Sequence, residues 1–216
     1  MKNLYFIRHG QTLFNKLNKV QGASDSPLTQ LGEKASSQLG LYLKENNIQF
    51  DTVYTSDLGR ARQTAKRIVR NLANPNTPLI ETRDLREVSF GSFEGGSNDV
   101  LWAEASKAAP DLAVDESSSD KDKIHILDTI KRIDPLNLAE SFEEVSDRIA
   151  RVLDKARTEE AENLLFVSHG LFINTLLYIL SDQKRHVTTI PNTSVTKITY
   201  EQGEFTIVYI GRVENL

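Results

Sequence analysis

Two short apolar runs in this chain end in the same pair of residues. Residues 4–7 lead into Arg8-His9-Gly10, and residues 164–167 lead into Ser168-His169-Gly170. Each run has the length and composition of a buried strand. In an open α/β sheet, ligands bind just outside the carboxyl ends of the strands, so two parallel neighbours would place both imidazoles in one crevice. With Arg8 beside the first histidine, this crevice suits an anionic substrate, most naturally a phosphate.

Strand-like and helix-like stretches alternate along most of the chain, which indicates the α/β class. We expect strands at 52–55 and 78–82, and helices from about 29 to 45, from Ser141 onward and from 170 to 180. Ser56-Asp57 resembles an N-cap pair and predicts a further helix that runs to residue 72. Leu31, Ala35, Leu39 and Leu43 predict the apolar face of the first helix. Ser141 and Glu144 form a capping box, and residues 194–210 predict a terminal hairpin turning at 201–203. Residues 91–140 lack a steady period, so we expect an inserted lid rather than a separate domain.

Composition excludes several classes of function. The 216 residues carry 26 basic and 30 acidic side chains, a net charge of −4, so we expect no nucleic-acid partner. The chain has no cysteine, which excludes disulfides, thiolate metal sites and cysteine nucleophiles. No apolar run reaches the length of a membrane span, and the first residues do not form a signal peptide, so we expect a cytoplasmic protein without a membrane partner.

Phosphoryl transfer needs a nucleophile and compensation for the charge on three oxygens. His9 is the candidate nucleophile, provided that it is neutral and a backbone carbonyl holds its other ring N–H. Gly10 would let the backbone approach the phosphate. Arg60 stands in the first turn of a helix, where anions bind, and could form a bidentate bond to phosphate. A protonated His169 would stabilise an equatorial oxygen, with backbone N–H groups offered by Gly170 and Leu171.

The leaving alcohol needs a proton, which a carboxylic acid could donate before it activates water for the second half-reaction. Glu87 follows the strand at 78–82 and is the first candidate, with Glu94 as its local rival. His125 and His186 lie in poorly patterned or polar segments, and we take both as non-catalytic. A metal ion on His9 and His169 would need a third ligand, and none has suggestive spacing, so no metal is predicted.

Taken together, these residues resemble the motifs of the histidine phosphatase superfamily, the phosphoglycerate mutase-like proteins. Residues 6–12 resemble its signature, and Asn15 and residues 21–32 resemble the loop that follows. Residues 56–65 resemble its second arginine motif, and residues 85–95 resemble its acid-bearing segment. Ser168-His169-Gly170 resembles its closing motif. The resemblance covers residues 1 to about 96 and 141 to 200.

The resemblance implies a three-layer sandwich over residues 1–216, with a mostly parallel central sheet and helices on both faces. It implies a covalent phosphohistidine on His9, a phosphate pocket lined by Arg8, Arg60 and His169, and Glu87 as the proton donor. It also implies contacts to phosphate or substrate from the side chains and backbone of Thr12, Asn15, Gln21 and Gly22. Neither a metal nor another cofactor is implied.

The family contains hydrolases and mutases, which differ in the tract after the acid. Residues 87–95 resemble the phosphatase branch, and the chain is short for a cofactor-dependent mutase. We therefore predict a metal-independent phosphomonoesterase acting on a small phosphorylated metabolite. A cofactor-dependent phosphoglycerate mutase is the alternative, and a non-enzymatic phosphate-binding module is a third reading. The natural substrate stays open, as does the oligomeric state, with a homodimer through the edge of the terminal hairpin as one option.

Overall fold

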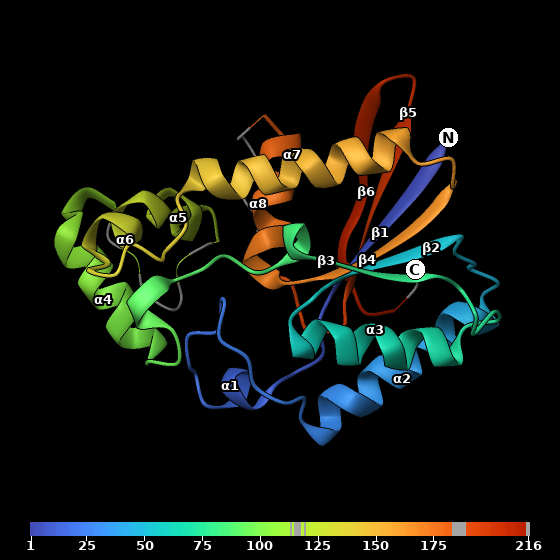
Figure 1. Cartoon of the computed structure of the whole chain (residues 1–216), viewed down its shortest axis with the longest axis horizontal. Coiled ribbons are helices and arrows are strands. Elements are labelled where there is room, and N and C mark those ends of the chain that lie inside the picture. The colour runs from blue at the N-terminus through green and yellow to red at the C-terminus, as the bar shows by residue number, and fades with distance from the viewer. Residues whose placement is uncertain (113, 115–117, 119, 183–188, 215–216) are drawn as a thin grey trace.

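The computed structural model describes residues 1–112, 114, 118, 120–182 and 189–214, and it contains a six-stranded sheet of order β3-β2-β4-β1-β5-β6 (Figure 1). The four strands β3, β2, β4 and β1 pair in parallel, whereas β5 and β6 are antiparallel. The expected α/β class with a mostly parallel sheet is confirmed. The strands are β1 Lys2–Arg8, β2 Thr52–Ser56, β3 Leu79–Thr82, β4 Asn163–Ser168, β5 Val195–Glu201 and β6 Glu204–Arg212.

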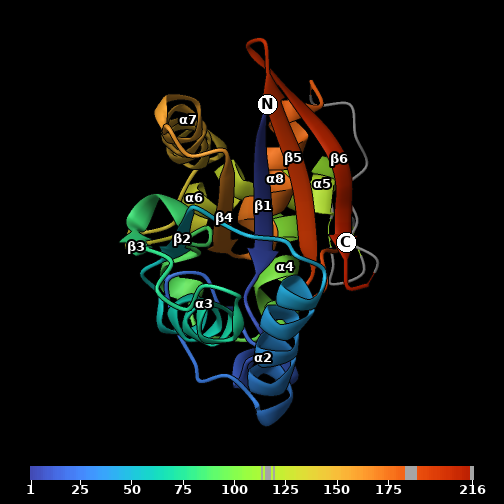
Figure 2. The ribbon, with the colours of Figure 1, turned by 90° about the vertical axis from the view of Figure 1, so that its right-hand side faces the viewer.

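Helices cover both faces of this sheet (Figures 1 and 2). Along β1, Leu4 and Phe6 pack in a cluster with residues of α7 (Phe142–Thr158) and α8 (Gly170–Leu180). Tyr5 and Ile7 pack instead with α2 (Gln30–Glu45) and α3 (Gly59–Asn71). This alternation follows from the two-residue period of a strand, which sends successive side chains to opposite faces. A central strand of this kind is buried on both sides, so its run of apolar residues is unbroken.

The buried face of α2 differs from the predicted one. Leu31 is 63% exposed, and the helix instead buries Gly32, Ser36 and Gly40 beside Leu39 and Leu43. A Cβ atom on Gly40 would lie 2.6 Å from the carbonyl oxygen of Ile68 on α3. The two helices therefore approach so closely that small residues form their contact, and a pattern of large apolar side chains does not predict it.

Two predicted helix starts have different outcomes. The capping box of Ser141 and Glu144 at the start of α7 is confirmed. The cap expected from Ser56-Asp57 is wrong, because α3 begins at Gly59 with Leu58 as its N-cap and without a capping side chain. Asp57 instead accepts two hydrogen bonds of 2.6 Å from Arg86, which lowers the pKa of the Asp57 carboxyl.

The described part of residues 91–140 contains short helices that lie to one side of the sheet, at the left of Figure 1. Asp134 joins the two ends of this segment by accepting hydrogen bonds from the backbone N–H groups of Ser92 and Ala139. The remaining helices of the described chain are α1 Leu13–Lys16, η1 Arg83–Leu85, η2 Gly91–Phe93, α4 Asn98–Ala108, η3 Pro110–Leu112, α5 Asp120–His125 and α6 Leu127–Ile133.

The terminal hairpin is confirmed. Gln202 and Gly203 connect β5 to β6, both with positive φ of 52° and 90°. A tight two-residue hairpin turn requires positive φ at both of its central residues, and glycine adopts positive φ without strain. Within the part of the chain that the model describes, none of the helices is both long and apolar enough to cross a membrane.

Candidate active site

The two histidine-bearing strand ends lie side by side. Strands β1 and β4 pair in parallel with Arg8 opposite Ser168, and the backbone N–H of His9 donates to the carbonyl of Ser168 at 2.9 Å. The imidazole centroids of His9 and His169 are 5.1 Å apart, and both side chains are buried. The crevice predicted at the carboxyl ends of these strands therefore brings both rings together.

A backbone carbonyl fixes the ring of His9. Its Nδ1 lies 2.8 Å from the carbonyl oxygen of Gly10. Because a carbonyl only accepts, Nδ1 carries the proton and the neutral ring keeps a lone pair on Nε2. Burial lowers the pKa of His9 well below its usual value, and the charges of Arg60 and Arg8 lower it further. The neutral nucleophile expected from the sequence thus has a physical basis.

His169 adopts the opposite tautomer. Its Nδ1 accepts a hydrogen bond from Nε of Arg60 at 3.2 Å, so a neutral ring carries its proton on Nε2. Burial, Arg60 and His9 lower the pKa of His169 well below its usual value. For the site without an anion, a neutral His169 is favoured over the expected protonated one, because the ring is buried beside a second imidazole and the guanidinium groups of Arg60, Arg148 and Arg8. Among the described residues, Nε2 of His169 has no hydrogen-bond partner although it is buried.

The side chain of Arg60 is fully buried and uses its whole donor capacity on the protein. A guanidinium has five N–H donors. Here Nε donates to His169, Nη1 to Ser24 and Asp25, and Nη2 to the carbonyls of Gln21 and Gly22. The expected bidentate bond to phosphate uses two N–H donors, so it would require exchange of two of these bonds.

Glu87 lies at the start of α8, next to His169. Its carboxylate accepts hydrogen bonds from the backbone N–H groups of Leu171 at 3.1 Å and Phe172 at 2.8 Å. The Leu171 N–H that the sequence assigned to phosphate therefore has Glu87 as its partner. Burial raises the pKa of Glu87, although Arg60 and the N–H bonds oppose the shift. A raised pKa is what a carboxylic acid needs to donate a proton near neutral pH.

The segment that carries Glu87 is held by Arg148, which the sequence did not single out, and by Ser168 of the closing motif. Arg148 on α7 donates to the carbonyl oxygens of Arg86 at 2.8 Å and Glu87 at 3.3 Å, and it pairs with Glu140. Ser168 donates to the carbonyl of Leu85. The bonds from Arg148 and Ser168 to these carbonyl oxygens span sixty or more residues of sequence, so no local pattern predicts them.

A second missed group lies just before β5. Asn192 donates to the carbonyl of His9 at 2.9 Å and to the amide oxygen of Asn15 at 3.3 Å. The carbonyl of Ile190 accepts from Nη1 of Arg8 at 2.5 Å. On the other side of Arg8, a Cβ atom on Gly170 would lie 3.2 Å from Nε. The backbone thus confines Arg8 from two sides.

Thr12, Asn15 and Gln21 form a connected group beside His9. Thr12 and Asn15 make a capping box on α1, and the hydroxyl of Thr12 also donates to the amide oxygen of Gln21 at 3.1 Å. The Nε2 of Gln21 is buried and has no hydrogen-bond partner among the described residues. These oxygens are occupied by neighbours, so the NH₂ groups of Asn15 and Gln21 are the parts of these side chains suited to a phosphate.

Gly10 has a packing role that the sequence did not predict. Its N–H donates to the hydroxyl of Thr64 at 2.9 Å, so its own N–H is directed at α3. A Cβ atom at this position would lie 2.8 Å from the carbonyl oxygen of Gly32 and 2.9 Å from Oγ of Ser36. Close packing against α2 therefore accounts for the glycine.

The remaining candidates are the rival acid Glu94 and the two histidines taken as non-catalytic. Glu94 accepts hydrogen bonds from the backbone N–H groups of four residues, Gly22, Ala23, Ser24 and Phe90, so it is engaged away from Glu87. His125 is exposed on α5 and contacts the hydroxyl of Tyr178 at 3.1 Å. His186 lies outside the described residues.

Comparison with known proteins agrees with this geometry. The model of the histidine phosphatase superfamily (branch 1) matches residues 4–212, and the chain belongs to that superfamily. It is 29% identical to a broad-specificity phosphatase of Saccharomyces cerevisiae over 99% of this chain and 86% of that protein.

Two solved structures extend the comparison. A phosphoglycerate mutase from Bacillus anthracis strain Sterne is 34% identical, with a TM-score of 0.86 over 98% of this chain and 93% of that one. A phosphoserine phosphatase from Entamoeba histolytica in complex with 3-phosphoglyceric acid is 25% identical, with a TM-score of 0.69 over 98% of both chains. The similar proteins thus include phosphatases and a mutase.

The two histidines provide a direct test of the site. At about pH 6, below the ordinary histidine pKa, we expect both rings to be neutral in the free protein. We expect the proton of His9 on Nδ1 and that of His169 on Nε2. Long-range ¹H–¹⁵N correlation spectra measure this, with His9→Asn and His169→Asn variants assigning the signals. A doubly protonated ring, or the same tautomer at both positions, contradicts the geometry.

Proposed function

We propose that this chain is a phosphomonoesterase that transfers the phosphoryl group of a small phosphorylated metabolite to His9 and then to water. The observation that carries the proposal is the ring of His9: its Nδ1–H is held by the carbonyl of Gly10, which directs the basic Nε2 to act as the nucleophile. Arg8 and Arg60 supply positive charge beside it. The nucleophile, the acid and the cations are all side chains, so the proposal requires no metal.

In the first half-reaction, Nε2 of His9 attacks the phosphorus atom and a P–N bond forms as the P–O bond to the alcohol breaks. The carboxylic acid of Glu87 gives its proton to the leaving oxygen, which departs as a neutral alcohol. The Nε2–H of His169 donates to an equatorial oxygen of the phosphoryl group. Its neutral form suffices for this, because a neutral imidazole still offers one donor.

In the second half-reaction, the Glu87 carboxylate takes a proton from water as the water oxygen attacks phosphorus. The P–N bond breaks, inorganic phosphate leaves, and His9 and the acid return to their starting forms. Arg8, the amide groups of Asn15 and Gln21, and the backbone at Gly170 would bind the phosphate or the substrate. The N–H and the carbonyl of Gly22, which the family resemblance assigned to the same task, are instead bonded to Glu94 and Arg60. Thr12 would act through Asn15 and Gln21, which it already bonds.

The composition of residues 87–95 favours hydrolysis over a mutase reaction, and a broad-specificity phosphatase is among the relatives that match along nearly the whole chain. The likeness to a phosphoglycerate mutase keeps the mutase reaction as the alternative. A mutase must return its phosphoryl group to a bound acid, whereas a phosphatase passes it to water, so the products separate the two.

The first experiment follows phosphate release from an aryl phosphate and from 3-phosphoglycerate in the presence of EDTA. We expect release by the wild type and by His125→Ala, a matched histidine variant outside the site, and loss of release in His9→Ala. Formation of 2-phosphoglycerate is followed in the same reactions. Isomerisation that needs a bisphosphoglycerate primer, with little release, would replace the proposal by the mutase reaction.

Glu87→Gln tests the proton donor. For an alkyl phosphate, whose leaving group needs a proton, we expect kcat/KM to fall by about 10²- to 10⁴-fold. For p-nitrophenyl phosphate, whose leaving group is stable as an anion, we expect a much smaller loss. Burial raises the pKa of Glu87, so the wild-type kcat/KM for the alkyl substrate should fall as pH rises through that value.

In the Glu87→Gln variant this alkaline decline should disappear, because the group that loses the proton is gone. Glu104→Gln serves as a matched control, since Glu104 is exposed on α4 and pairs with Lys107. An equal loss of kcat/KM on both substrates would show that Glu87 is not the proton donor.

A further inference from the structure

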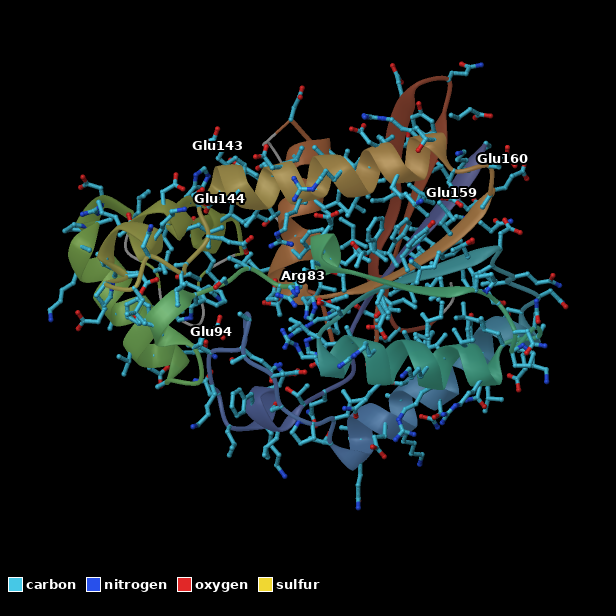
Figure 3. All side chains as sticks on the ribbon, viewed as in Figure 1. Arg83, Glu94, Glu143, Glu144, Glu159 and Glu160 are labelled. Carbon is cyan, nitrogen blue, oxygen red and sulfur yellow. The ribbon has the colours of Figure 1, made fainter. Side chains whose placement is uncertain are left out.

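The carboxylate of Glu94 holds the loop between α1 and α2. Glu94 follows η2, and its oxygens accept hydrogen bonds from the backbone N–H groups of Gly22 at 3.0 Å, Ala23 at 2.8 Å and Ser24 at 2.9 Å. A fourth bond comes from Phe90 at 2.9 Å. Figure 3 shows Glu94 where the chain entering α4 meets this loop.

The same loop holds the guanidinium of Arg60 with its other backbone groups. The carbonyls of Gln21, Gly22 and Ser24 accept from Nη1 and Nη2 of Arg60 at 2.8 to 3.2 Å. The N–H groups of residues 22–24 are therefore bonded to Glu94, and carbonyls of residues 21–24 are bonded to Arg60. Since Nε of Arg60 donates to Nδ1 of His169, the loop links Glu94 to the catalytic histidine.

The contact between Glu94 and the loop is too close for any side chain at Gly22. A Cβ atom there would lie 2.4 Å from Oε1 of Glu94 and 2.1 Å from the carbonyl oxygen of Val88. The loop therefore rests directly on the acid-bearing segment, with the Glu94 carboxylate as the acceptor for consecutive N–H groups. A buried guanidinium can keep one orientation only if its acceptors are fixed, and here four of them, three carbonyls and the carboxylate of Asp25, belong to this loop.

We propose that Glu94 is a positioning residue: its carboxylate fixes the backbone of residues 21–24, which orients Arg60 and, through Arg60, the tautomer of His169. This inference rests on the proposed function for its kinetic consequence. The two glutamates of the segment then have different roles: Glu87 acts on the leaving group, whereas Glu94 acts on the phosphate pocket. Glu94 has no part in proton transfer.

Glu94→Gln tests this role. The amide has one oxygen and an NH₂ group in place of two acceptors, so it cannot accept all four N–H bonds. We expect kcat/KM to fall by about 10- to 100-fold, the loss typical of a displaced catalytic group. The loss should be equal for p-nitrophenyl phosphate and an alkyl phosphate, because Glu87 still supplies the proton. Glu94→Asp keeps the carboxylate and should recover part of the activity, and Glu104→Gln is the matched control.

The ring of His169 gives a readout that needs no turnover. In Glu94→Gln we expect the ¹⁵N signals of His169 to shift toward a mixture of tautomers, as the bond from Arg60 is no longer fixed. Circular dichroism and thermal midpoints establish whether the variants fold. If Glu94→Gln does not fold, the His169 signals are measured in Glu94→Asp instead. If the wild type shows no phosphatase activity, a changed His169 signal still supports the positioning role.

Three results would overturn the inference. One is a folded Glu94→Gln variant with wild-type kcat/KM and an unchanged His169 signal. Another is a loss of stability alone, with kinetics and His169 signals unaffected, which would reduce Glu94 to a structural residue. The third is a loss confined to the alkyl phosphate, which would make Glu94 the proton donor.

Discussion

The parallel pairing of β1 with β4 is the constraint on which the rest of the site depends. Because Arg8 stands opposite Ser168, the residues that follow each strand leave the sheet at the same level, and the two imidazoles lie 5.1 Å apart. The topology achieves this by inserting β4 between β1 and β2, although more than a hundred residues separate β4 from either strand. A shift of one residue in this register would send one histidine to the opposite face.

Burial of positive charge beside two imidazoles determines their chemistry. Arg60 is fully buried, and its acceptors are one imidazole nitrogen, the carboxylate of Asp25 and three loop carbonyls. Its charge lowers the pKa of both histidines and also opposes the rise in the pKa of Glu87. A bound phosphate would bring the opposite charge into this pocket. The site is therefore complementary to an anion before any substrate is bound.

The sequence predicted the parts of this structure that local patterns encode. Neighbouring residues in the sequence determine three such features: the strands ending in His-Gly, the capping box at Ser141 and the terminal hairpin. The place of Glu87 after a strand, together with the family resemblance, predicts it as the acid. The partners of Arg60, and the roles of Arg148 and Asn192, could not be predicted, because a side chain that bonds a distant backbone group leaves no periodic signal. The same holds for Gly10 and Gly40, where the reason for a glycine is the backbone of another element.

The most direct test of the account is to trap the phosphoryl group on the protein. Glu87→Gln keeps the nucleophile but lacks the group that activates water, so reaction with radiolabelled aryl phosphate should accumulate a phosphoenzyme. We predict a label that is stable in alkali, labile in acid, located on the peptide containing His9, and absent from Glu87→Gln/His9→Ala. A label on another residue, or undiminished phosphate release by His9→Ala, would contradict the central role assigned to His9.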